Sequence, residues 1–155
     1  MDILLWWLTA DCFISSLGAV VKIVRMRGVA SPINPFHYDH QAIVRDVEAR
    51  CLPQDPVTGC ILLDSTSKLY VRWKFTNLVT GDDNDEHYVH RMYFACKNLV
   101  ALENNQSLHV SHLCHMRKCL SHLSYEPASL NRFRAECAKA RHCYGHDGFL
   151  PCHLV

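Results

Sequence analysis

Apolar and polar side chains alternate along residues 68–75, which is the pattern of a β-strand with one buried face. The apolar set, which we expect to face the core, comprises Leu69, Val71, Trp73 and Phe75. The opposite face would present Tyr70, Arg72 and Lys74, so it is basic and contains an aromatic ring. Two interpretations of this face stay open: an ordinary solvated strand surface, or a surface that contacts phosphate groups.

Two further stretches have helical spacing. Apolar residues recur at i, i+4, i+7 and i+11 along residues 87–102, at Val89, Tyr93, Cys96 and Val100. This spacing predicts a helix with Cys96 as a core thiol. A shorter helix is predicted over residues 41–51, where Ala42, Val44 and Val47 are loosely periodic.

The segments between these elements complete an α+β pattern. Residues 59–64 form a short apolar run and predict a strand. Residues 80–86 are polar and acidic, and we expect a loop that points away from any phosphate backbone. Residues 126–134 indicate the start of a helix, because Pro127 suits a first helical turn. The expected fold is a small, loop-rich α+β domain with a short antiparallel sheet.

The N-terminal residues 3–24 are largely apolar, but Asp11 and Lys22 interrupt the run. A charge near the middle of a membrane costs about 3 kcal/mol, which argues against a spanning helix. A buried or dimer-forming helix is favoured, with Cys12 as a core thiol, and a signal or membrane anchor is the alternative. The two prolines within residues 28–41 indicate a linker. We therefore divide the chain into an accessory segment, residues 1–50, and a second domain, residues 51–155.

The length and net charge of the chain restrict its possible functions only slightly. At 155 residues the chain is long enough for one domain with a modest core. The net charge of +1 does not by itself indicate a nucleic-acid-binding protein. Acidic residues are concentrated in residues 82–86, however, whereas the last third carries the basic residues Arg117, Lys118, Arg132, Arg134, Lys139 and Arg141. A positive face is therefore possible.

The strongest chemical signal is cysteine and histidine at metal-ligand spacing. The second of two clusters is complete in sequence: Cys137, Cys143, His146 and Cys152. The first contains Cys114, Cys119 and His122, and its fourth ligand must come from elsewhere. We favour Cys60, with Cys51 and His115 as alternatives. Because the count of nine cysteines is odd and histidines are interleaved, two structural Zn²⁺ sites are favoured over disulfides.

The same region resembles a known family. The motifs that carry the resemblance are His112-Leu113-Cys114-His115, Cys119-x2-His122, Glu126-Pro127, Asn131-Arg132-x-Arg134-x2-Cys137 and Cys143-x2-His146-x5-Cys152. They are similar to the zinc-binding loop region of the His-Cys box homing endonucleases, which are His-Me finger (ββα-metal) nucleases. The resemblance extends from about Gly59 to Cys152. It departs from the family at Ser124, where some members have the histidine ligand of the first zinc site.

The resemblance implies roles for particular residues. His112 would activate the attacking water as a general base, and Asn131 would hold one catalytic Mg²⁺. Arg72 would approach the scissile phosphate, with Arg91 as the alternative. The basic residues Arg132 and Arg134, on the helix after Asn131, could grip the DNA backbone.

The predicted function is therefore a zinc-stabilised, Mg²⁺-dependent endonuclease that acts on double-stranded DNA. We expect a homodimer, because cutting both strands needs two active sites, a nuclear location, and no stable membrane partner. The alternative is a catalytically inactive zinc domain that binds nucleic acid or protein. A third hypothesis is a secreted, disulfide-linked protein.

Overall fold

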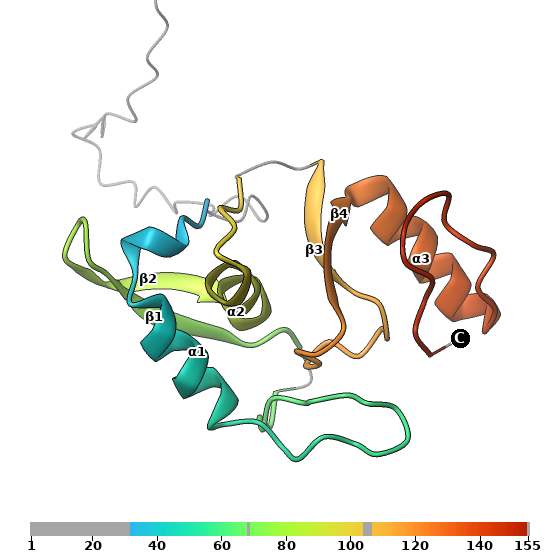
Figure 1. The fold of residues 1–155 in the computed structure, drawn as a ribbon, viewed down its shortest axis with the longest axis horizontal. Coiled ribbons are helices and arrows are strands. Elements are labelled where there is room, and N and C mark those ends of the chain that lie inside the picture. Colours follow the sequence, from blue (N-terminus) through green and yellow to red (C-terminus); the bar gives the residue numbers. More distant parts are fainter. Residues whose placement is uncertain (1–31, 68, 104–106, 155) are drawn as a thin grey trace, which may run out of the picture.

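The computed structural model describes residues 32–67, 69–103 and 107–154 (Figure 1). The predictions for residues 3–24 and Cys12 lie outside the described residues. No helix within the described ranges is long and apolar enough to cross a membrane. The described elements, in chain order, are η1 (Pro35–His37), α1 (His40–Glu48), β1 (Arg72–Asn77), β2 (Asp82–Tyr88), α2 (Val89–Asn98), β3 (Leu108–His112), β4 (Leu123–Pro127) and α3 (Ala128–Ala140).

The first hairpin pairs β1 with β2 in antiparallel register, with Arg72 opposite Tyr88 and Lys74 opposite Glu86. The predicted alternation is confirmed for Trp73 and Phe75, which face the core, but Leu69 is 66% exposed and precedes the strand. The acidic loop predicted at residues 80–86 was wrong, because most of it is β2. Its polar side chains do not prevent pairing, since they find cross-strand partners: the Arg72–Glu86 ion pair measures 3.2 Å.

The second hairpin leads directly into a helix. β3 pairs with β4, with Ser111 opposite Ser124, and α3 begins at Ala128. Pro127 is the N-cap residue rather than a member of the first turn. A β-hairpin followed by a helix is the arrangement that the family resemblance implies.

The helix α2 lies between the two hairpins and organises the core (Figure 1). On one side it packs against α1, where Val47 of α1 meets Val89 and Tyr93 of α2. On the other side Met92 joins Val110 of β3 in a second apolar cluster. α1 therefore contributes to the core, although it falls within the range assigned to the accessory segment.

The observed helices differ in length from the predicted ones because of the residues at their ends. Asp39 caps α1 by accepting a hydrogen bond from the amide of Ala42 at 2.9 Å. α2 was predicted to reach residue 102, but it ends at Asn98 because Leu99 adopts a left-handed conformation with φ of 53°.

The strand predicted for residues 59–64 was wrong. That segment instead makes isolated bridges, Leu62 with Cys119 and Leu63 with Cys51. Its backbone groups are divided between two different neighbours, so no continuous ladder forms. The small α+β fold with short antiparallel sheets is nevertheless confirmed.

Candidate metal centres and active-site hairpin

The first Cys/His cluster consists of Cys60, Cys114, Cys119 and His122, whose ligand atoms all lie within 4.8 Å of one another. Nδ1 of His122 is 3.4 Å from the Sγ atoms of both Cys60 and Cys119. Zn–S and Zn–N bonds of about 2.3 and 2.0 Å at a tetrahedral angle require an S···N separation of about 3.5 Å. The residues therefore fit a structural zinc ion.

Cys60 reaches this cluster because its segment bridges the loop after β3. The amide of Leu120 donates to the carbonyl of Ile61 at 2.8 Å. The alternative ligand Cys51 instead donates its thiol to the carbonyl of Val47, at 3.2 Å. The structure thus brings Cys60, and not Cys51, to the other three ligands.

The second cluster joins the end of α3 to the C-terminal loop. Its members are Cys137, Cys143, His146 and Cys152. Nε2 of His146 lies 4.0, 3.4 and 3.2 Å from the three sulfurs in that order. This set also fits a tetrahedral zinc ion. All eight described cysteines are free, including the buried Cys96, so nothing in the described part of the chain supports a disulfide framework.

A buried ion pair connects the second cluster to the hairpin. Arg134 of α3 makes two hydrogen bonds to the carboxylate of Glu126, and its Nη1 lies 3.8 Å from Sγ of Cys152. The hydroxyl of Ser111 on β3 donates to the same carboxylate. Arg134 is only 1% exposed, so its predicted contact with a DNA backbone was wrong. Arg132, two residues earlier in α3, is exposed.

His153, which follows the ligand Cys152, packs against the first cluster. Its ring stacks on His122 with centroids 3.7 Å apart, and its ring Nε2 lies 2.7 Å from the carbonyl of Thr58. Its amide donates to the carbonyl of Leu113. No sequence spacing predicted this contact, because it depends on the chain returning from the second cluster to the first.

His112 ends β3 and is buried, with 7% exposure. Its ring lies 4.9 Å from that of His90 and 5.7 Å from that of Tyr70, measured between centroids. Burial lowers the pKa of His112 to about 4, so its imidazole is neutral at pH 7. Its Nε2 has no hydrogen-bond partner among the described residues.

Asn131 lies in the first turn of α3, and its amide Nδ2 is 3.2 Å from Nδ1 of His109 on β3. Within the described ranges no hydrogen bond joins Asn131 to His112. His109 and His112 have opposite parity on β3, so they face opposite sides of the strand. Burial, followed by the charges of Arg132 and Arg91, lowers the pKa of His109.

Comparison with known proteins shows the family of this chain. The family described as the zinc-binding loop region of homing endonuclease matches residues 59–152. The chain belongs to this family. The matched range contains all eight ligands of the two clusters, together with both hairpins, α2 and α3. No curated protein and no solved structure matches the chain significantly.

Two arginines of this zinc-loop family member were predicted to approach a phosphate. Arg72 pairs with Glu86 and lies over the ring of Tyr88, 4.8 Å from its centroid. Arg91 is half-buried on α2, and its positive charge lowers the pKa of both His90 and His109 after the larger effect of burial. Arg91 is therefore within electrostatic range of the Asn131–His109 pair.

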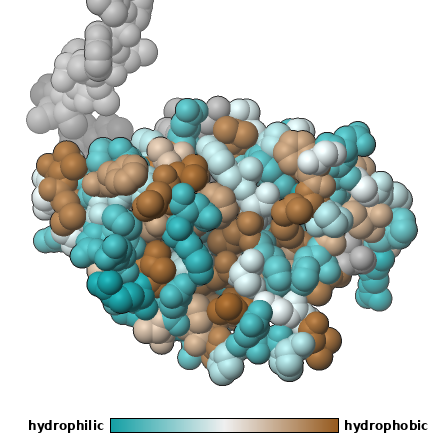
Figure 2. Space-filling view, in the orientation of Figure 1, coloured by the Kyte–Doolittle hydropathy of each residue, from teal (hydrophilic) through white to brown (hydrophobic). Residues whose placement is uncertain are grey.

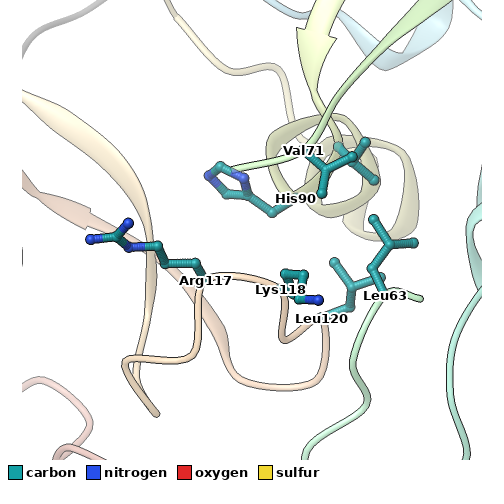
Figure 3. Close-up of a pocket in the computed structure, with 7 residues that line it drawn as sticks. Leu63, Val71, His90, Arg117, Lys118 and Leu120 are labelled. Atoms are coloured by element: carbon teal, nitrogen blue, oxygen red, sulfur yellow. The ribbon is translucent and has the colours of Figure 1, made fainter. Parts of the chain in front are cut away.

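A small pocket opens beside His90, next to the buried ring of His112. Figure 3 shows His90 projecting from α2 into a space faced by Arg117 and Lys118 of the loop after β3. Leu63, Val71 and Leu120 complete its apolar wall. The Nζ of Lys118 donates to the carbonyl of Ser65 at 2.6 Å, and burial lowers the pKa of His90 well below 6.5, so its ring is neutral at pH 7.

Proposed function

We propose that the chain is a zinc-stabilised, Mg²⁺-dependent endonuclease that hydrolyses phosphodiester bonds in DNA. The observation that carries the proposal is the hairpin–helix unit β3–β4–α3 between two complete Cys/His clusters, with His112 at the end of β3 and Asn131 in the first turn of α3. Family membership supports the same reading.

Asn131 fits the role of a magnesium ligand. A neutral imidazole accepts one hydrogen bond, so His109 can accept at Nδ1 from the amide Nδ2 of Asn131. The carbonyl Oδ1 is then left for a hard cation. Mg²⁺ commonly takes few protein oxygens and completes its octahedron with water and phosphate. When bound, it would neutralise the charge that develops on the phosphate and the leaving oxygen.

His112 is our candidate for the general base. Its neutral ring has an unpartnered Nε2 that can accept a hydrogen bond from water. Exposure of the ring on DNA binding would raise its pKa from about 4 toward the 6.5 of a free imidazole, where it can act as a base at neutral pH. Because Tyr70 and His90 cover the ring, the proposal requires Tyr70 to move when DNA binds. Tyr70 is half-exposed and lies outside any strand, so this movement breaks no sheet pairing.

Phosphate binding has two candidate sources of positive charge. Arg72 would exchange Glu86 for a phosphate, at the cost of a surface ion pair worth about 0–1 kcal/mol. Arg91, near His109, would need no exchange of partner with a carboxylate among the described residues. We propose Arg72 for the phosphate role, as the resemblance implies, with Arg91 as the alternative.

Three observations favour a second candidate function, a zinc domain that binds nucleic acid or protein without cleaving it. His112 is buried, and Arg72 is already paired with a carboxylate. His112 also lies on the face of β3 opposite to His109, the residue that Asn131 contacts. These features suit a scaffold that has kept its zinc clusters and lost a working pair of base and metal ligand.

Cleavage of supercoiled plasmid distinguishes the endonuclease from the zinc domain that binds without cleaving. The zinc-loaded chain should nick the plasmid with Mg²⁺ and not with Ca²⁺. His112→Ala and Asn131→Ala should each abolish nicking while about two zinc ions per chain are retained. The matched controls His40→Ala and Asn98→Ala, both on other helices, should nick normally. DNA binding without nicking would establish the second function instead, and nicking that survives His112→Ala would remove that residue from the mechanism.

We also propose that the chain acts on double-stranded DNA as a homodimer in the nucleus. A reducing compartment suits the free, metal-spaced thiols. Sedimentation of the DNA complex tests the dimer: two chains per duplex site support it, and one chain per site contradicts it.

A further inference from the structure

Aromatic side chains gather on the surface beside the second cluster, although nothing in the described structure covers them. Phe133 of α3 is 45% exposed, and Tyr144 of the following loop is 61% exposed. Their rings are stacked with centroids 6.4 Å apart and planes inclined by 28°. The ring of His142 meets Tyr144 edge-on at 5.1 Å. We call these three residues the aromatic platform.

The second metal cluster, rather than an apolar core, holds the platform in place. Phe133 also contacts the ring of the ligand His146, at 5.4 Å and edge-on. Cys143, another ligand, lies between His142 and Tyr144 in sequence. The rings are thus held while exposed, and the free energy of burying them remains available to a binding partner.

The platform has a basic border. Arg132 adjoins Phe133 on α3, and Arg141 immediately precedes His142. Both are exposed, and no ion pair joins either to a carboxylate in the part of the chain that the structure describes. The nearby Glu136 is instead paired with Lys139, at 2.7 Å.

We propose that the aromatic platform binds the unpaired bases of a nucleic-acid strand, with Arg132 and Arg141 contacting the strand's phosphates. Exposed flat rings with arginines beside them are what bases stack on, and stacking accepts any base. A closed duplex offers the rings only base edges in its grooves. A second copy of the chain would bring two sets of unpaired arginines together, which is unfavourable.

The inference concerns binding alone and holds whether or not the chain cleaves DNA.

Fluorescence anisotropy with the full-length, zinc-loaded chain tests this proposal. The probes are a labelled 20-nucleotide single strand of mixed sequence and the matching blunt duplex, in Ca²⁺ so that no cleavage occurs. Tyr144→Ala and Phe133→Leu should each weaken single-strand binding by about 5- to 100-fold, the range expected for loss of one stacked base. Duplex binding should change by less than about 2-fold. The control Phe36→Ala removes an aromatic ring on η1 that is 65% exposed, and it should leave both affinities unchanged.

Two further readouts make the result decisive. Zinc content should stay at about two per chain in every variant, which excludes collapse of the second cluster. Arg132→Gln should reduce the salt dependence of single-strand binding, whereas Tyr144→Ala should not. Unchanged single-strand affinity in Tyr144→Ala would overturn the proposal. So would a concentration-dependent dimer of the free chain that Tyr144→Ala dissociates, since the platform would then bind a second copy.

Discussion

The guanidinium of Arg134 donates two hydrogen bonds to the carboxylate of Glu126, at N–O distances of 2.8 and 2.9 Å. The pair lies in the interior between β4 and α3. Neither side chain is more than 1% exposed. Through Cys152 on one side and Ser111 on the other, this pair connects a metal cluster to the hairpin that carries His112. The second cluster therefore holds the position of α3, and with it Asn131, against β3.

Replacing one member of this pair should be costly. Arg134→Met leaves the carboxylate of Glu126 buried without its partner, and we expect a loss of about 3–5 kcal/mol in the free energy of unfolding. The control Arg132→Met, on the exposed side of the same helix, should change it by about 0.5 kcal/mol or less. Urea unfolding of the zinc-loaded chains measures both. The double variant Arg134→Met/Glu126→Leu should recover part of the loss, and equal values for Arg134→Met and its control would contradict the pair's role.

The two clusters should lose zinc independently. Cys119→Ser removes a ligand of the first cluster and Cys143→Ser one of the second, so each should lower the zinc content by about one ion per chain. Cys96→Ser is the matched control. Its thiol is buried, which raises its pKa to about 12, and it lies outside both clusters. Elemental analysis of the purified chains gives the counts, and a loss of zinc in Cys96→Ser would show that the cluster assignments are incomplete.

The stacking of His153 on His122 should strengthen the first site. His153→Ala removes the ring that holds a ligand imidazole, and effects of this kind lower metal affinity by about 10- to 100-fold. Competition with a chromophoric chelator should detect a weakened first zinc and an unchanged second one. Leu154→Ala, the next residue in the chain, provides the comparison and should behave like the unmodified protein.

The buried His90 should make stability depend on pH. Burial, together with the charges of His112 and Arg91, lowers the pKa of His90 well below 6.5 in the folded chain. Below the unfolded-state pKa of about 6.5 the unfolded chain binds a proton that the folded chain does not, so stability falls as the pH decreases. Each unit of pKa depression contributes about 1.4 kcal/mol.

A substitution isolates this contribution. His90→Phe keeps a flat ring in the cluster and removes the titrating group, so its stability should fall less between pH 7 and pH 5 than that of the unmodified chain. Unfolding is followed at each pH with zinc content measured in parallel, because the ligands also bind protons. Parallel pH curves for the two proteins would show that the folded chain does not lower the pKa of His90.

On the face shown in Figure 2, exposed apolar groups lie among polar ones. The turn between β1 and β2 contributes Leu78 and Val79, both well exposed. The aromatic platform differs from these aliphatic residues because its rings contact each other and a metal cluster.

The sequence alone determined the ligand types of the two metal clusters. Cysteine and histidine at metal-ligand spacing predicted both clusters, since ligand type and loop length are local properties, and period-2 and helical spacing predicted most of β1 and α2. The tertiary structure decided what depends on distant segments meeting: the choice of Cys60 over Cys51, the acidic β2 formed because β1 supplies basic partners, and the burial of Arg134 against Glu126. It also decided which histidine lies beside Asn131. Alternation along β3 places His109 and His112 on opposite faces of the strand, and only the packing of the helices brings α3 to His109 and α2 to His112.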